Sequence, residues 1–188
     1  MQHKIAIIGM SGLFPGSSTN EAFWQNLMAA KDLTGLASEK DFGVDPQHFY
    51  QEGKGVVDKC YSLRGGYIRD FEFDASGYQL PADFLSRQDQ LYQWSLFVAK
   101  EALRDSGYLS NASLEDCGVV LGNLSFPTPS SHKLLSSVYS QTTESALQQL
   151  FADEQFAMEA FRQMPADNEV LQYTPSEMVA KALGLGAT

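Results

Sequence analysis

Two short runs of apolar residues stand apart along the chain. The first, Ile5-Ala6-Ile7-Ile8, ends at Gly9, and the second, Cys117-Gly118-Val119-Val120-Leu121, ends at Gly122. Neither run alternates apolar with polar positions, and such continuity is typical of strands that are buried on both faces of a sheet. The two runs therefore predict buried strands of an α/β fold.

Apolar positions at helical spacing predict a helix soon after the first run. Residues 10–16 have the composition of a turn, and Ser18 and Glu21 then have the spacing of a capping box with Ser18 as the N-cap. We expect this helix to end near residues 33–35. Its helical spacing brings four bulky apolar residues to one face: Phe23, Trp24, Leu27 and Met28.

The strongest helical pattern runs from Ser86 to Ser106, and Gly107 follows it as a helix stop. Three further helices are expected later in the chain: 131–150, 153–163 and 176–183, the last with Ser176 as its N-cap after Pro175.

The segment 36–80 is irregular, rich in Gly and Asp, with aromatic residues interleaved. Within it, residues 60–70 favour a short strand or hairpin, because Gly65-Gly66 suits a tight turn or a close backbone approach. A loop this long in a compact domain is usually functional or an interface element, unless the assignment of elements is wrong.

Composition narrows the class of partner. Hydrophobic residues make up 44% of the 188 residues, which suffices for a buried core, and the formal net charge is −10. Nucleic acids and anionic membrane surfaces are bound mainly by Lys and Arg, so the acidic balance disfavours both. Solubility is the simplest reason for the charge.

Possible targeting segments and the cysteines indicate in which cellular compartment the protein is found. No apolar run approaches the roughly 20 residues that span a bilayer, and Met1-Gln2-His3-Lys4 leads into a strand without a signal-peptide pattern. Cys60 and Cys117 lack metal or redox spacing, which fits a reducing environment. We therefore predict a cytoplasmic protein.

Candidate chemistry is sparse. The glycines of residues 9–16 do not have the spacing of a dinucleotide-binding turn, and no phosphate-loop lysine follows them, so a structural turn is the favoured interpretation. A small nucleotide-binding protein is the alternative for these glycines.

Neither a metal site nor a catalytic set stands out among the other residues. His3, His48 and His132 are scattered without spacing that suggests a general base or a metal site. Cys117 heads a predicted buried strand and Cys60 follows Lys59, and bystander cysteines are the stronger interpretation of both.

Short motifs follow one another in order along most of the chain: Ile5-Ala6-Ile7-Ile8-Gly9-Met10, Phe14-Pro15-Gly16, Phe23-Trp24, Arg64-Gly65-Gly66-Tyr67-Ile68, Phe71-Glu72-Phe73-Asp74-Ala75, Ala102-Leu103-Arg104-Asp105-Ser106-Gly107-Tyr108 and Gly118-Val119-Val120-Leu121-Gly122. Together they resemble the β-ketoacyl synthase family, and in particular the ketosynthase domains of modular synthases. The segment 70–78 is most similar to the ketosynthase at the start of a polyunsaturated-fatty-acid synthase polypeptide.

This resemblance implies an α/β, thiolase-like fold, of which residues 1–188 would be the incomplete N-terminal half, a mixed sheet with flanking helices. Enzymes of this family are acyltransferases that take an acyl chain from an acyl-carrier protein onto a cysteine. They then condense it with a malonyl thioester and release carbon dioxide. The resemblance implies no cofactor and no metal.

The family's layout also places the chain's end just before the expected nucleophilic cysteine. The cysteine and the histidines, or histidine and asparagine, lie beyond residue 188 in the family's order, so no catalytic residue is assigned. By the same layout, the loop at 123–126 approaches the acyl pocket and the dimer interface. Leu124 and Phe126 are the substrate-binding candidates, with ordinary packing at a strand end as the alternative.

Two hypotheses of different class follow. In the first, the chain is part of a ketosynthase that is catalytic only with the remainder present, and acyl-carrier protein, acyl thioesters and a dimer or partner domain are its partners. In the second, it is a non-catalytic interaction module, or a chain-length-factor-like partner that keeps the fold without the cysteine. In either case a sheet cut at this point leaves an unpaired edge and an uncovered apolar face.

Overall fold

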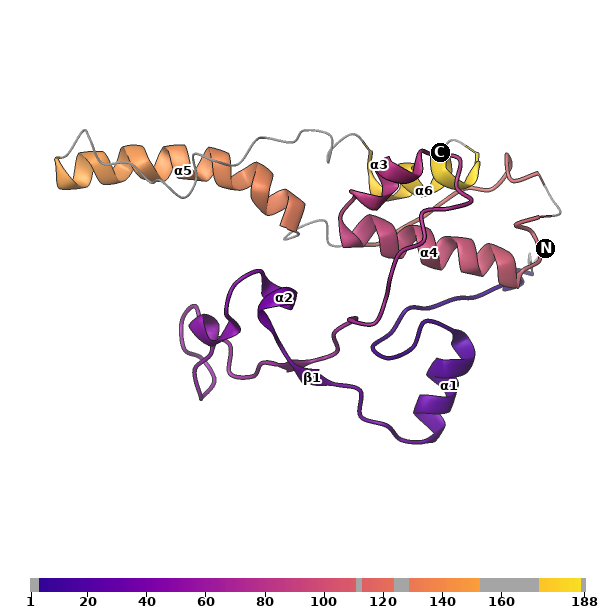
Figure 1. The fold of residues 1–188 in the computed structure, drawn as a ribbon, viewed down its shortest axis with the longest axis horizontal. Helices are drawn as coiled ribbons and strands as arrows, with labels where there is room; N and C mark the ends of the chain where they lie inside the picture. The colour runs from indigo at the N-terminus through magenta and orange to yellow at the C-terminus, as the bar shows by residue number, and fades with distance from the viewer. Residues whose placement is uncertain (1–3, 111–112, 124–128, 153–172, 187–188) are drawn as a thin grey trace. The chain divides into compact units, whose positions relative to one another are not determined.

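A computed structural model describes residues 4–110, 113–123, 129–152 and 173–186 (Figure 1). The chain divides into two compact units. Unit 1 comprises residues 1–74 and 97–112, and unit 2 comprises residues 75–96 and 113–188. Each unit is therefore built from two separate stretches of sequence, and helix α4 (Gln90–Asp105) contributes its first half to unit 2 and its second half to unit 1.

Unit 1 consists of short elements joined by long turns. Strands β1 and β2 pair antiparallel, with Gly35 opposite Gly65 and Leu36 opposite Arg64. The expected strand or hairpin at residues 60–70 is thus present, and its partner lies about thirty residues earlier in the chain. The elements of this unit, apart from α4, are α1 (Asn20–Met28), β1 (Gly35–Leu36), α2 (Glu39–Phe42), the 3₁₀ helix η1 (Pro46–Phe49) and β2 (Arg64–Gly65).

Helix α1 starts one residue later than the capping pattern suggested. The N-cap is Thr19, whose Oγ1 accepts a hydrogen bond from Ala22 N at 3.1 Å, so the assignment of Ser18 was wrong by one position. None of the helix's residues is buried, and Trp24 and Met28 on the predicted apolar face are 60% and 68% exposed. The apolar face predicted from the sequence therefore exists but is uncovered in the described residues.

The expected strand at residues 5–8 forms no ladder with any other described residue. Ile5 and Ile7 are 95% and 85% exposed. The second expected strand, at 117–122, is also without strand structure, and Val120 is 96% exposed. A strand needs hydrogen-bonded neighbours on its edges, and within the described part of the chain only β1 and β2 provide them to each other.

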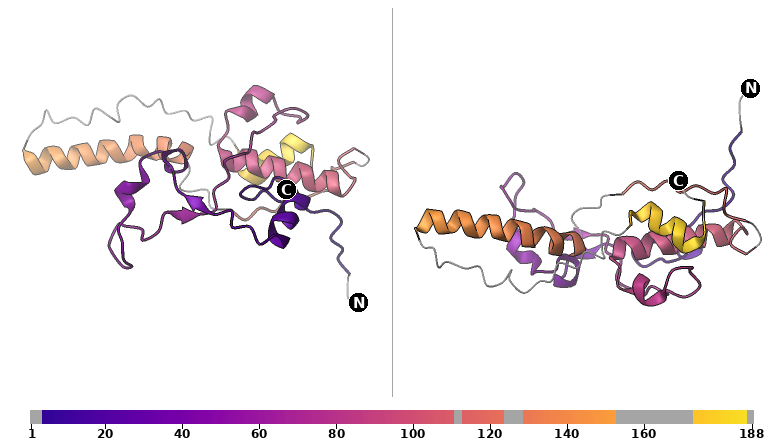
Figure 2. Two further views of the ribbon diagram at one scale, coloured as in Figure 1. Left: turned by 60° about the horizontal axis from the view of Figure 1, so that its bottom comes forward. Right: turned by 90° about the horizontal axis from the view of Figure 1, so that it is seen from above.

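Unit 2 holds the better-formed core. The four largest fully buried side chains among the described residues are Leu85, Leu96, Met178 and Val179, and all lie in this unit. They come from α3 (Ala82–Ser86), the first half of α4, and α6 (Pro175–Leu183). Helix α6, at the yellow end of the colour scale, runs beside α4 in the views of Figures 1 and 2.

Polar contacts tie the two stretches of unit 2 together. The Tyr92 hydroxyl donates to Tyr173 O at 2.9 Å, and burial, with a further contribution from Asp89, raises the pKa of Tyr92. Gln79 N donates to Ala182 O at 2.8 Å, and Gly186 N donates to Leu114 O at 3.1 Å. The first two bonds hold residues 75–96 to the segment 173–186, and the third closes a loop within the second stretch, 113–188.

The strongest predicted helix, Ser86–Ser106, corresponds to α4, which begins four residues later than expected, and the short helix α3 lies before it. α3 ends at Ser86, and α4 begins at Gln90 after a turn in which Arg87 N and Gln88 N donate to the carbonyl oxygens of Phe84 and Leu85. The stop at Gly107 is confirmed, because this residue has φ +76°, in the left-handed region that glycine favours.

The bounds of the later helices agree with the prediction, but the predicted N-cap residue does not. α5 spans Pro129–Phe151, and the helix expected at 153–163 lies outside the described residues. In α6, Pro175 occupies the first turn and Thr174 Oγ1 caps Glu177 N at 3.3 Å, so Ser176 is not the N-cap. None of the helices in the described ranges has the length and apolar character needed to cross a membrane.

We predict that Leu96→Ala lowers the free energy of unfolding by about 2–5 kcal/mol, because it leaves a cavity among fully buried side chains. Urea unfolding followed by circular dichroism measures the change. Leu27→Ala is the matched control: Leu27 is 56% exposed, so its truncation should change stability by no more than about 0.5 kcal/mol. Equal effects of the two substitutions would show that the packing around Leu96 is not the main core.

Candidate functional site

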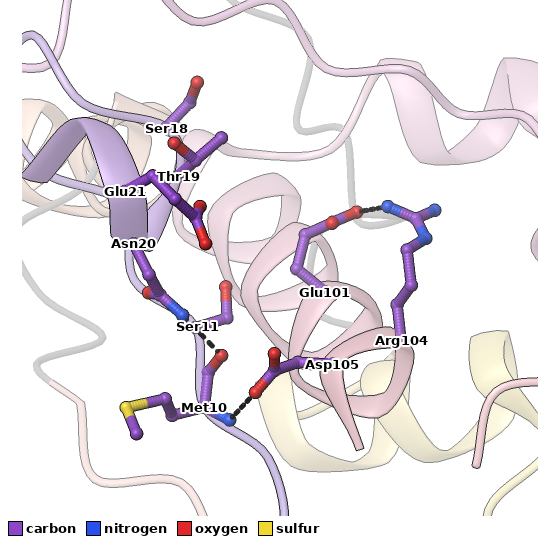
Figure 3. A pocket seen from close by; sticks show the side chains of 9 residues that line it. All are labelled: Met10, Ser11, Ser18, Thr19, Asn20, Glu21, Glu101, Arg104 and Asp105. Atoms are coloured by element: carbon purple, nitrogen blue, oxygen red, sulfur yellow. Dashed lines mark hydrogen bonds and ion pairs between the residues drawn. The ribbon is translucent and has the colours of Figure 1, made fainter. Parts of the chain in front are cut away.

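A polar pocket in unit 1 lies where the chain leaves the first apolar run. It has a volume of about 280 Å³ and is formed by the turn after Gly9, the start of α1 and the last turns of α4. Figure 3 shows its side chains from close by. The residues that line it are Met10, Ser11, Ser18, Thr19, Asn20, Glu21, Glu101, Arg104 and Asp105.

The backbone of Met10 is held from both sides in this pocket (Figure 3). Met10 N donates to Asp105 Oδ2 at 2.9 Å, and Asn20 Nδ2 donates to Met10 O at 2.8 Å. These bonds join the N-terminal segment to the ends of two helices, which accounts for polar residues at these positions without a catalytic role.

Gly9 has a packing role. A Cβ atom at this position would lie 2.5 Å from Ala102 O and 2.8 Å from Ser106 Cβ, so only glycine lets the segment approach α4 this closely. At residues 14–17 the chain reverses, with Phe14 and Ser17 exchanging backbone hydrogen bonds of 2.8 and 2.9 Å. The sequence prediction of a structural turn for residues 9–16 is confirmed.

The charges of the pocket argue against a phosphate ligand. The first turn of α1 offers backbone N–H groups, but the carboxylates of Glu21, Glu101 and Asp105 line the same pocket. Arg104 forms an ion pair with Glu101, so its charge is already neutralised locally. A nucleotide phosphate would meet net negative charge here, and the nucleotide-binding alternative finds no support.

The same pocket lacks the groups for covalent or metal chemistry. Ser11 contributes a hydroxyl, but activation of a serine needs a general base within hydrogen-bond reach, and no histidine lines the pocket. Across the described ranges of the chain, no cluster of three His, Cys, Asp or Glu side chains could hold a metal ion. The interactions seen in this pocket are those that hold the N-terminal segment to α1 and α4.

A second group of charges, around β1, stabilises the irregular segment. Arg69 Nη2 donates to Asp41 Oδ2 and to Leu36 O, both at 2.6 Å, and the guanidinium lies 5.0 Å from the centroid of the Tyr67 ring. Asp41 also accepts hydrogen bonds of 2.7 Å from Ser38 N and Oγ, completing a capping box at α2. Hydrogen bonding from Arg69, then from Ser38, lowers the pKa of Asp41 to about 2.

Asp32 has a similar environment nearby. The hydroxyl of Thr34 donates to Asp32 Oδ1 at 2.6 Å and Thr34 N does so at 2.9 Å, while Arg64 pairs with Oδ2. These contacts, with those of Thr34 first, lower the pKa of Asp32 to about 2. Neither Asp32 nor Asp41 was predicted as a functional or structural residue from the sequence, although Ser38 and Asp41 have a recognisable capping-box spacing.

Neither cysteine has the surroundings of a nucleophile. Cys60 lies in a loop with its Sγ donating to Phe49 O at 3.2 Å, and the neighbouring cation, Lys59 Nζ, donates to His48 O at 2.6 Å. Cys117 is half-buried in a segment without helix structure. A reactive thiolate is favoured by a helix N-terminus or a free cation, and neither cysteine has one.

The two substrate-binding candidates, Leu124 and Phe126, lie outside the described residues. The structure therefore leaves their assignment as a prediction. Of the three histidines, His48 lies in η1, His132 lies in α5, and His3 is outside the described part.

A family profile described as "Beta-ketoacyl synthase, N-terminal domain" matches residues 2–180. The chain belongs to the β-ketoacyl synthase family. A solved structure described as "PfaC Keto synthase-Chain length factor" is 44% identical, with a TM-score of 0.80 over 96% of the chain and 20% of that protein. This likeness confirms the expected α/β, thiolase-like fold, of which the described helices and small sheet form a part.

Curated relatives point to the same kind of synthase. Two of them are polyunsaturated fatty acid synthase polypeptides of Thraustochytrium sp.: the chain is 30% identical to one over 82% of its length, and 26% identical to the other over 99%. It is 35% identical to polyketide synthase ThaG of Burkholderia thailandensis over 58% of its length. The resemblance to ketosynthases of polyunsaturated-fatty-acid and polyketide synthases is confirmed.

The chain spans only a small part of these relatives: 5% and 8% of the two Thraustochytrium polypeptides, and 2% of ThaG. Each of these relatives therefore contains much more protein than the part that matches the 188 residues.

We predict that Gly9→Ala destabilises the chain by about 1–3 kcal/mol, because the added methyl group would collide with the backbone of α4 at Ala102. Gly118→Ala is the matched control, since a Cβ there would meet nothing within 4 Å. Thermal unfolding of both variants measures the difference. A Gly9→Ala variant as stable as the control would contradict the close approach.

We also predict that the Asp41 carboxyl titrates near pH 2. Because its pKa is depressed on folding, its contribution to stability is complete above the unfolded pKa of about 4 and is lost as the pH falls towards 2. Side-chain ¹³C shifts followed by NMR from pH 6 down to about pH 1 measure the midpoint. Arg69→Gln should raise that midpoint, and an unchanged midpoint in this variant would show that the ion pair does not hold the carboxylate.

Proposed function

We propose that this chain is the N-terminal part of a β-ketoacyl-[acyl-carrier-protein] synthase domain. The complete domain performs the decarboxylative condensation of acyl and malonyl thioesters in fatty-acid or polyketide synthesis. The observation that carries the proposal is the family match over residues 2–180, joined to a close structural likeness over 96% of the chain. Acyl-carrier protein, acyl thioesters and a partner domain are its proposed partners, in the cytoplasm.

The chain's own contribution is scaffold. Its pocket after Gly9 holds the N-terminal segment by Asp105 and Asn20, and its two cysteines lack the surroundings that activate a thiol. Nucleophilic attack on an acyl thioester, and activation of the malonyl unit, therefore require groups other than those found in the described residues.

Exposed apolar residues support the need for further protein. In unit 1, Ile5, Ile7 and Trp24 are all more than half exposed, although they belong to the segments that match the family. Surfaces of this kind are covered in stable proteins by another part of the fold or by a partner. We infer that the unpaired segment 5–8 becomes a strand when a neighbouring strand is present.

A second candidate function is that of a chain-length-factor-like partner. One specific observation favours it: the similar solved structure is described as a keto synthase joined to a chain length factor. Such a partner would keep the fold and lack the nucleophilic cysteine. Reading the gene past the codon for Thr188 separates the two candidates, because a cysteine at the family's nucleophile position requires the first and another residue there requires the second.

We predict no acyl transfer to this chain. With octanoyl-CoA, a thiolate would form a new thioester and release the free thiol of CoA, adding the mass of one acyl group to the protein. Intact-mass spectrometry should show no stoichiometric adduct, with Cys60→Ala and Cys117→Ala as controls that locate any background modification. Complete, site-specific acylation of either cysteine would overturn the scaffold role.

A further inference from the structure

A second pocket of unit 1 has a volume of about 370 Å³ and shares no lining residue with the pocket after Gly9. It lies between the end of β1, the helix η1 and the segment before β2. Apolar walls come from Leu36 and Leu63, and phenol rings come from Tyr50 and Tyr61. Ligand pockets have this combination of apolar walls and a few polar groups, and a volume near the lower limit suits a ligand of about ten non-hydrogen atoms.

Backbone hydrogen bonds fix the walls of this pocket. Ala37 N donates to Leu63 O at 2.8 Å, which extends the β1–β2 pairing past Leu36. On the other side, Cys60 N donates to Phe49 O at 2.7 Å and Gln51 N donates to Cys60 O at 3.0 Å, which positions Tyr50 next to the segment of Tyr61. The pocket is therefore formed before any ligand arrives.

One cation lies over the ring of Tyr61, a residue that lines this pocket. Lys54 Nζ lies 5.1 Å from the centroid of the Tyr61 ring, and within the described ranges it forms no ion pair. The neighbouring cations are engaged: Arg64 pairs with Asp32, Arg69 pairs with Asp41, and Lys59 donates to the carbonyl oxygen of His48. Of these four cations, Lys54 is the one without an ion pair or a hydrogen bond within the described ranges.

We propose that this pocket binds a small amphiphilic carboxylate. Its apolar body packs against Leu36, Leu63 and the ring of Tyr61, and its carboxylate pairs with Lys54. The carboxylates of Glu52 and Asp58 lie in the same loop, so the attraction is local to Lys54 and is weakened by salt. This inference goes beyond the proposed condensation and does not depend on it.

Octanoate is the probe, titrated into the ¹⁵N-labelled protein and followed by amide shifts in NMR spectra. We expect saturable shifts at Leu36, Tyr61 and Leu63, with a dissociation constant in about the millimolar range for a ligand of this size. Octan-1-ol, which has the same chain length without the charge, should bind several-fold more weakly, and added salt should weaken octanoate alone.

Two matched variants test the role of the cation. Lys54→Gln should weaken octanoate binding by about two- to fivefold, the usual effect of an exposed ion pair. Lys40→Gln removes another lysine of the same unit and should leave binding unchanged. Both side chains are exposed, so unchanged spectra without ligand report that the variants keep their fold.

Three outcomes would overturn the proposal: no saturable shifts at the pocket, equal binding of octanol and octanoate, or equal binding by the Lys54→Gln variant. Displacement of octanoate by a short acidic peptide with an apolar residue, at much lower concentration, would also overturn it and identify a protein-docking surface. The acyl-transfer experiment tests only the two cysteines, and octanoate binding tests only the pocket. Failure of the carboxylate proposal therefore does not affect the proposed ketosynthase function, and the reverse also holds.

Discussion

The burial of α6 is the constraint on which the best-ordered part of this chain depends. Met178 and Val179 of α6 are fully buried, as are Leu85 and Leu96 of the same unit, and these four are the largest fully buried side chains among the described residues. The hydrogen bond from Tyr92 to Tyr173 O closes the same core at its edge. Helix propensity alone stabilises helices of this length only marginally, so the packing of their apolar faces supplies most of their stability.

Unit 1 has none of the four largest fully buried side chains, and polar contacts hold its loops instead. Its long turns are fixed by hydrogen bonds and ion pairs, such as Arg69 with Asp41, while Ile5, Ile7 and Trp24 remain exposed. Polar contacts of this kind define local geometry but add little net stability at a protein surface. The unit therefore has a defined backbone course together with an uncovered apolar surface, which is the combination expected of one part of a larger fold.

Elements specified by neighbouring residues were predictable, and elements specified by distant residues were not. The helices α1, α5 and α6 follow from local spacing, with errors of one or two residues at the N-caps, where Thr19 and Thr174 cap in place of nearby serines. The end of α1 was placed less well: the helix stops at Met28, before the expected end at residues 33–35. The strand expected at 5–8 was read correctly as apolar, but a strand exists only with a partner, and none of the described residues pairs with it.

The two pockets also show this difference between features set by neighbouring residues and features set by distant ones. The glycine-rich turn could be interpreted as structural from spacing, whereas the approach of Gly9 to Ala102 joins residues far apart in sequence and was not predictable. Family kinship came from ordered motifs, and the profile match over residues 2–180 confirms it. The pocket bordered by Tyr50 and Tyr61 had no signal beyond an irregular segment with interleaved aromatics, because its walls come from three separate stretches.

The core of unit 2 combines residues 75–96 with residues 173–186, so it cannot form on the ribosome until the second of these segments has been synthesised. Leu85 and Leu96 are synthesised long before Met178 and Val179. Their apolar side chains therefore stay exposed to water while the intervening residues are made. Contacts of such sequence separation also slow folding, because a long loop must close first. Until α6 has been synthesised, the apolar side chains of α3 and α4 therefore have no α6 to pack against, and apolar surface of this kind makes an unfinished chain prone to aggregate.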